Sequence, residues 1–194
     1  MDSPSQPRDP RGETLKKAMI LFWREGAEQT SYPEIVAATG ASRKALYGWW
    51  PEKGELIRDS LALYQNEVLD RAMAPLESGD ANGLAVFWNL IEAACQAPDW
   101  RGCYLCRSGA GPLAADPAIR SQLEAHVDRV RDQIAASIAV SQAKGEIAGD
   151  IDPDQAGLLS AALVVLISTL GAQGGWSARI AELIRQARVT CGLG

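Results

Sequence analysis

A short run of helix-starting and helix-ending residues between Ser31 and Pro51 constrains the fold most strongly. The sequence Ser31-Tyr-Pro-Glu34 has the pattern of a capping box, in which the side chain of each end residue binds the backbone amide of the other. Gly40 suits the left-handed conformation that ends a helix, and Ser42 can cap the next helix. Pro51 ends that helix, because proline disfavours helical geometry in the residue before it. These signals predict two short helices joined by a tight turn, which is a helix-turn-helix.

The second of these helices, over residues 43–50, has two chemically distinct sides at about 100° per residue. One side carries Arg43, Lys44, Tyr47 and Gly48, and the other carries Ala45, Leu46, Trp49 and Trp50. Two cations and a phenol suit the phosphates and base edges of DNA, and a glycine beside them allows close approach. The alternative is a solvated basic face on an ordinary core helix.

The remaining patterns predict further helices. Apolar or small residues recur at helical spacing over residues 15–26, and over residues 56–69 within one longer predicted helix that spans residues 52–73. Asp116-Pro117 and Asp152-Pro153 each have the pattern of an N-cap followed by proline at the first helical position. No segment alternates with a period of two residues. The predicted fold class is therefore all-α, with about nine helices.

Composition narrows the class of protein. The chain has 194 residues, of which 47% are hydrophobic and 22% are charged, as in soluble globular proteins. The net charge of −5 arises after residue 60, since residues 1–60 carry nine basic and nine acidic side chains. The N-terminal third is therefore repelled less by phosphate. The first residues lack a signal-peptide pattern and the four cysteines lack disulfide-dense spacing, so we expect a cytoplasmic protein with reduced thiols.

Residues 12–57 resemble the N-terminal DNA-binding domain of the TetR (tetracycline-repressor) family of bacterial transcription regulators. The resemblance is carried by the segments "LFWREG", "TSYPEIVAATGAS", "ALYGWW" and "EKGELI". It implies contacts with the DNA backbone from Thr30, Ser31, Ser42, Tyr47 and Lys53, and base contacts from Arg43 and Lys44. Trp49 matches a position that contacts the backbone in the family, although the helical wheel turns it toward the core, and both interpretations stay open.

Residues 101–123 resemble, more loosely, the effector domain of one subgroup of the same family. This resemblance implies that Cys103 and Cys106 lie near the pocket for a small-molecule effector. We expect the pocket to be lined by Trp88, Trp100, Cys103, Tyr104, Cys106 and His126. The aromatic residues in this set could equally be core, and His126 could be a half-buried structural histidine.

The Cys103-x-x-Cys106 pair allows several interpretations. It can be two small apolar residues of a helix core, a sensor of electrophiles or oxidants, or the centre of a small thiol oxidoreductase. A sensor needs a lowered thiol pKa, which Arg107 could provide from one turn away from Cys103. Zinc would need two more ligands, and His126 is the only histidine. We therefore expect no metal and no cofactor.

The last helices have more apolar surface than one chain of this size needs. Residues 158–172 are apolar nearly all round, are too short for a membrane span and predict a buried helix. The following helix carries the stripe Trp176, Ile180, Leu183, Ile184 and Ala187. Such excess usually indicates a partner, and the resemblance implies a homodimer formed through a four-helix bundle.

These patterns and the resemblance together predict a disordered tail over residues 1–11, a DNA-binding domain over 12–57, and a helical ligand-binding and dimerisation domain over 58–194. The predicted function is that of a transcription regulator rather than an enzyme. We expect a homodimeric repressor that binds double-stranded operator DNA and is released from it by a small molecule. A thiol-based sensing regulator is the alternative, and a thiol oxidoreductase is the enzyme alternative.

Overall fold

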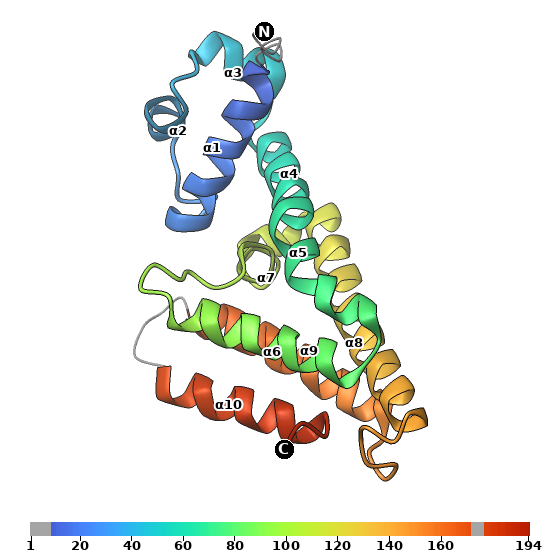
Figure 1. Cartoon of the computed structure of the whole chain (residues 1–194). Coiled ribbons are helices and arrows are strands. Elements are labelled where there is room, and N and C mark those ends of the chain that lie inside the picture. Colours follow the sequence, from blue (N-terminus) through green and yellow to red (C-terminus); the bar gives the residue numbers. More distant parts are fainter. Residues whose placement is uncertain (1–8, 172–176) are drawn as a thin grey trace, which may run out of the picture. The chain divides into compact units, whose positions relative to one another are not determined.

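The computed structural model of the chain describes residues 9–171 and 177–194. The first eight residues of the tail predicted over residues 1–11, and Trp176, lie outside them. The described residues form ten α-helical segments and no strand, which confirms the all-α class (Figure 1). The contacts divide the chain into two compact units, residues 1–64 and residues 65–194. The predicted domain boundary at residue 57 lies inside a helix, and the division falls at the end of that helix.

The first unit contains four α-helices. These are α1 (Pro10–Glu25), α2 (Tyr32–Thr39), α3 (Arg43–Trp49) and α4 (Lys53–Tyr64). Helix α1 starts two residues before the predicted start at Gly12, because the Asp9 carboxylate accepts a 3.0 Å hydrogen bond from the Gly12 amide and caps the helix. The core of this unit is built from side chains of all four helices, including Ala18, Phe22, Ile35, Leu46, Leu56 and Leu61.

The helix-capping and helix-ending residues predicted for α2 and α3 make the expected contacts. Ser31 and Glu34 form both halves of the capping box at the start of α2. Gly40 ends α2 in the left-handed conformation, with φ of 74°. The Ser42 hydroxyl accepts a 3.1 Å hydrogen bond from the Ala45 amide and caps α3. Because these contacts are local in sequence, residue types alone are enough to indicate a helix-turn-helix.

The second unit begins where the regular helix of α4 ends. Residues Gln65–Leu69 form a π-helical turn that leads into α5 (Asp70–Met73) and a 3-10 turn (Ala74–Ser78). The remaining helices are α6 (Ala81–Gln96), α7 (Tyr104–Gly109), α8 (Pro117–Ala143), α9 (Pro153–Leu170) and α10 (Ser177–Thr190), with a 3-10 turn (Pro112–Ala115) before α8. The chain from α4 to α5 was predicted as one helix, and the π-helical turn interrupts it.

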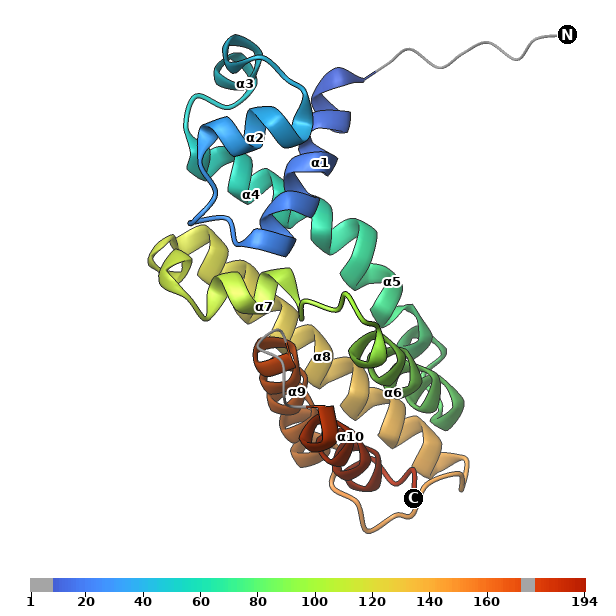
Figure 2. The ribbon, with the colours of Figure 1, turned by 90° about the vertical axis from the view of Figure 1, so that its left-hand side faces the viewer.

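Helix α9 lies along α8 and also packs against α10 (Figure 2). The two backbones of α8 and α9 approach so closely that a Cβ added at Gly157 would lie 2.6 Å from the Arg131 carbonyl oxygen. The core of the unit combines side chains of α6, α8, α9 and α10, among them Phe87, Trp88, Ile134, Ile138, Ile167 and Ile184. A glycine at position 157 is therefore required by the packing of these two helices.

The prediction that the apolar helix near the C-terminus is buried holds for one face only. Leu158, Leu159 and Leu166 of α9 are 58%, 53% and 40% exposed, whereas Ala161, Val164 and Ile167 are buried. By length and composition α9 would suffice to cross a membrane, and 39% of its residues are buried inside the unit. Helix α9 therefore buries one face within the unit and leaves apolar surface exposed on the other, as at a partner-binding site.

Candidate functional site

Helix α3 presents its predicted polar side to solvent. Arg43, Lys44, Tyr47 and Gly48 are exposed, and the Tyr47 side chain is 47% exposed. Leu46 on the opposite side is 1% exposed and belongs to the core. The predicted division of this helix into two sides is therefore present. No atom lies within 4 Å of a Cβ added at Gly48, so another molecule can approach the helix backbone closely there.

The end of α3 is fixed by Trp50, which is buried. Its indole N–H donates a 2.7 Å hydrogen bond to the Asp59 carboxylate, which also accepts one of 2.9 Å from the Arg11 guanidinium. The Arg11 guanidinium lies over the Trp50 ring, 5.0 Å from its centroid. Arg11 and Asp59 were not identified from the sequence. Arg11 is 39 residues from Trp50 and 48 residues from Asp59 along the chain, so no local pattern connects them. They hold α3 against α1 and α4.

Trp49, for which both a DNA contact and a core position were left open, is neither fully exposed nor fully buried. Its side chain is half-buried, and its ring packs edge-on against Trp50 with the centroids 5.8 Å apart. The neighbouring phenol, Tyr47, stacks on Tyr32 of α2 at 4.8 Å. Burial and the nearby Tyr47 raise the pKa of Tyr32, so it stays protonated and neutral at physiological pH. Aromatic contacts thus join α2 and α3 beside the basic face.

Three other residues that were predicted to contact the DNA backbone also lie in the first unit. Ser31 and Ser42 are exposed at the starts of α2 and α3, where the helix dipole favours an anion. Lys53, at the start of α4, donates a 3.0 Å hydrogen bond to the Glu28 carbonyl oxygen. Partial burial lowers the pKa of Lys53. The hydrogen bond to Glu28 holds its ammonium group in place.

Thr30 was predicted to contact the DNA backbone. Its side chain is 3% exposed, and its hydroxyl donates a 2.7 Å hydrogen bond to the Gly26 carbonyl oxygen. A hydroxyl that is buried and already donates to the protein is not offered to a phosphate. Contact of Thr30 with DNA stays a prediction, and it would require this hydrogen bond to break.

The predicted effector residues of the second unit are mostly enclosed by protein. Trp88 and Tyr104 are 0% and 2% exposed, and Trp88 packs edge-on against Phe87 at 5.3 Å. Trp100 is half-buried and lies against the end of α9, where its ring fills the position that a Cβ at Gly171 would take. Contact of these residues with a ligand stays a prediction, and Trp88 has the surroundings of a core residue.

The other three predicted effector residues come together. The ligand atoms of Cys103, Cys106 and His126 all lie within 4.8 Å of one another, and all three residues are buried. Cys103 caps α7, and its sulfur accepts a 3.3 Å hydrogen bond from the Cys106 amide. The sequence did not predict that His126 faces the cysteine pair, because 19 residues that include a 3-10 turn separate it from Cys106.

The electrostatics of this cluster favour neutral side chains. A hydrogen bond with Cys103 and burial raise the pKa of the Cys106 thiol well above its ordinary value. Burial, reinforced by the nearby Arg129 guanidinium, lowers the pKa of His126 to about 4. His126 is 6% exposed, so it is buried rather than half-buried as predicted. At neutral pH its imidazole is uncharged, with one ring nitrogen able to accept a proton or a metal ion.

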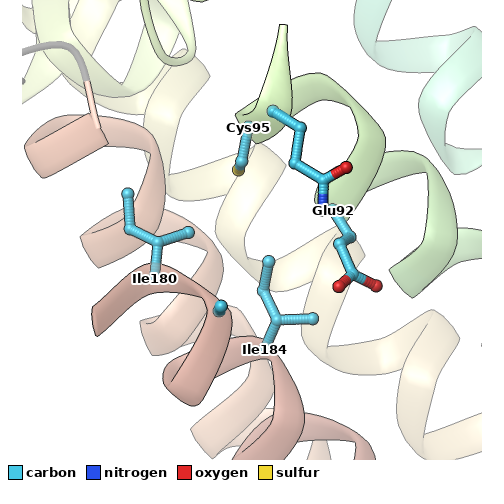
Figure 3. Close-up of a pocket in the computed structure, with 6 residues that line it drawn as sticks. Glu92, Cys95, Ile180 and Ile184 are labelled. Atoms are coloured by element: carbon cyan, nitrogen blue, oxygen red, sulfur yellow. The ribbon is translucent and has the colours of Figure 1, made fainter. Parts of the chain in front are cut away.

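A separate pocket of about 280 Å³ lies between α6 and α10. It is lined by Glu92, Cys95, Gln96, Ile180, Ala181 and Ile184, of which four are labelled in Figure 3. None of the six was predicted to bind a ligand. Burial raises the pKa of Cys95 to about 11, so its thiol is protonated at neutral pH. The sequence carries no signal for this pocket, because its two walls are about 90 residues apart along the chain.

Known proteins resemble both units. A family model described as "Bacterial regulatory proteins, tetR family" matches residues 15–59. The HTH-type transcriptional repressor ComR of Escherichia coli (strain K12) is 28% identical over 141 residues, which cover 71% of this chain and 67% of that protein.

Two solved structures share the fold over nearly the whole chain. One is a cysteine mutant of the TetR family transcriptional regulator CifR complexed with 26bp operator DNA, with a TM-score of 0.77 at 21% identity, covering 94% of this chain and 97% of that one. The other is a TetR-family transcriptional regulator from Streptomyces coelicolor, with a TM-score of 0.77 at 20% identity, covering 95% of this chain and 96% of that one.

Proposed function

We propose that the chain is a transcription regulator of the TetR family, and that it is a homodimeric repressor that binds operator DNA and responds to a small-molecule effector. The observation that carries the proposal is the exposed basic face of α3, which follows a capped turn and has its opposite side in the core. The ComR and CifR relatives are named as regulators rather than enzymes. A cytoplasmic location would give such a protein access to bacterial DNA.

The proposed interface assigns different roles to its residues. Arg43 and Lys44 enter the major groove and contact base edges, since a guanidinium or an ammonium group can donate to guanine O6 and N7. Ser31, Ser42, Tyr47 and Lys53 contact phosphates and position α3, and Trp49 lies at the rim of this surface. The Tyr32 ring supports Tyr47 from behind.

A dimer would bring a second helix-turn-helix to the operator. One helix-turn-helix contacts few base pairs, and two-fold dimers place two such helices about 34–36 Å apart in successive major grooves. The exposed leucines of α9 are apolar surface that a second copy would cover. Leu163 and Ile184, which the sequence suggested for this interface, are less suitable, because Leu163 is partly buried and Ile184 belongs to the core of its own unit.

The second unit would bind the effector. An effector that prefers one arrangement of this unit shifts the population of the dimer between DNA-competent and released forms. The π-helical turn at Gln65–Leu69 is a place where such a change can reach α4, since π-helical turns often mark functional sites. The thiol-sensing alternative has less support, because Cys103 and Cys106 are both buried and the Cys106 thiol is protonated at neutral pH. The oxidoreductase alternative shares this weakness.

The direct test is binding of the purified chain to the DNA upstream of its own coding sequence. Fluorescence anisotropy with this fragment and with a shuffled fragment, at several salt concentrations, gives both specificity and the number of phosphate contacts. We expect tighter binding to the upstream fragment by at least about 1,000-fold at physiological salt. Equal affinity for the two fragments would contradict a sequence-specific regulator.

A further inference from the structure

The cluster of Cys103, Cys106 and His126 in the second unit has the composition of a metal site. We propose that these three side chains bind a thiophilic divalent metal ion, with Zn²⁺ as the ion that fits best. Their ligand atoms lie within 4.8 Å of one another and come from two elements, the start of α7 and the middle of α8. Two sulfurs and one imidazole nitrogen are ligands that zinc prefers.

The spacing needs only a small adjustment. Zn–S bonds of about 2.3 Å and Zn–N bonds of about 2.0 Å place neighbouring ligand atoms about 3.5–3.8 Å apart in a tetrahedron. Each pair of atoms, at most 4.8 Å apart, would therefore approach by about 1.3 Å at most. Rotation of side chains can provide this, while the backbone of α7 stays in place through the hydrogen bond from the Cys103 amide to the Ser168 carbonyl oxygen, which measures 3.2 Å.

The charge balance favours a divalent ion. On binding, each thiol loses its proton to solvent and forms a sulfur–metal bond, so two protons are released for each ion bound. One divalent cation with two thiolates and a neutral imidazole has no net charge. A neutral assembly can be buried at far lower cost than an isolated ion. All three ligand residues are buried, and three protein ligands leave one position of a tetrahedron for a further ligand such as water.

The surroundings would orient the ligands. The Ser168 hydroxyl of α9 hydrogen-bonds the Cys106 thiol, and on the other side His126 lies close to Arg129, which pairs with Asp70 of α5. Such outer contacts fix the positions of metal ligands. A bound ion would therefore link α7 directly to α8. Its ligands would in turn be positioned by Ser168 of α9 and by the Arg129–Asp70 pair, which includes α5.

The test uses the full chain, reduced and freed of metal with a chelator, and Co²⁺ as the spectroscopic probe. We expect one Co²⁺ per chain, with a sulfur-to-cobalt charge-transfer absorption that Zn²⁺ abolishes by displacement. Cys103→Ser, Cys106→Ser and His126→Gln each remove a direct ligand, so each should weaken binding by at least the roughly 10–100-fold that loss of an outer partner costs. Cys191→Ser, which changes a buried thiol outside the cluster, and Cys95→Ser are matched controls and should bind as the unchanged chain does.

The same series of variants also shows whether a loss of metal binding is due to misfolding. Serine at position 103 can still cap α7, so this variant should keep its helical circular dichroism. Zn²⁺ should raise the Tm of the unchanged chain and of the two controls, and leave the Tm of the three ligand variants where it is, because an ion that binds only the folded state stabilises it. Absence of the charge-transfer band in the unchanged chain, or its loss in a control instead of a ligand variant, would overturn the proposal. No DNA is present, so this result is independent of the proposed function.

Discussion

At the scale of single residues, Asp59 holds the end of the proposed recognition helix in place. It accepts from the buried indole of Trp50 and from Arg11. Asp59→Ala leaves the indole N–H without this acceptor, so the free energy of unfolding of the first unit should fall by about 1–3 kcal/mol. Chemical denaturation checks this, with Glu25→Ala, an exposed change in α1, as the control. Equal stability of the two variants would show that Asp59 is dispensable.

The capping box makes the stability of α2 depend on pH. Hydrogen bonds from the Ser31 amide and hydroxyl lower the pKa of Glu34, so the folded state binds its proton less readily than the unfolded state does. The contribution of Glu34 is therefore fully present above its unfolded pKa, about 4.3, and is lost as the pH falls through the lower folded value. Glu34→Gln should remove this dependence, since glutamine also serves in a capping box.

Denaturation curves between about pH 2 and 7 compare the chain with Glu34→Gln. The difference in stability between the two should be constant at neutral pH and should change only in the acid range. A difference that stays constant down to the lowest pH would contradict the role of the carboxylate. The variant with Ser31→Ala should lose stability at every pH, because the cap itself is removed.

Residue types predicted the contacts that are local in the chain and missed those that are not. The caps at Ser31 and Ser42 each join residues three positions apart, so spacing alone indicated them. Asp59 and the cluster with His126 depend on where separate helices meet, which no local pattern states. For Thr30 the resemblance gave a position in the family and not the direction of its hydroxyl, which donates to the Gly26 carbonyl oxygen, so its contact with DNA stays a prediction.

At the scale of elements, the packing of α9 on α8 depends on a glycine. A Cβ at Gly157 would lie 2.6 Å from a backbone oxygen of α8, so Gly157→Ala should force the helices apart and destabilise the second unit by about 1–3 kcal/mol. The same change at Gly48 meets open space in α3 and should stabilise that helix by up to about 1 kcal/mol. Thermal unfolding followed by circular dichroism distinguishes the two. A loss of stability in both variants would contradict this account of Gly48.

Helix boundaries were predicted best where a side chain caps the helix. Asp116 and Asp152 start α8 and α9 as their Asp-Pro pairs indicated. The π-helical turn at Gln65–Leu69 was missed, because the apolar spacing of its residues is also compatible with a continuous α-helix. The start of α1 was placed two residues late, since a segment rich in proline and charge suggested disorder as far as Arg11.

At the scale of the whole molecule, the exposed leucines of α9 make the oligomeric state testable. Leu159→Glu should give a folded monomer, because two copies of a buried carboxylate would meet across a two-fold interface. Ile20→Glu, at an exposed apolar position of α1, is the control and should leave the dimer intact. Light scattering gives the mass and circular dichroism gives the fold. A folded dimer with Leu159→Glu would place the interface elsewhere.

The measurement that tests the central claim most directly compares the roles of basic residues on the same surface. We expect Arg43→Ala with Lys44→Ala to weaken binding to operator DNA by about 1–3 kcal/mol for each base that these side chains no longer reach, and to affect shuffled DNA much less. Lys53→Ala should weaken binding to both DNAs alike and reduce the salt slope by about one for each half-site. Equal effects of all these variants on operator and shuffled DNA would contradict the assignment of sequence recognition to α3.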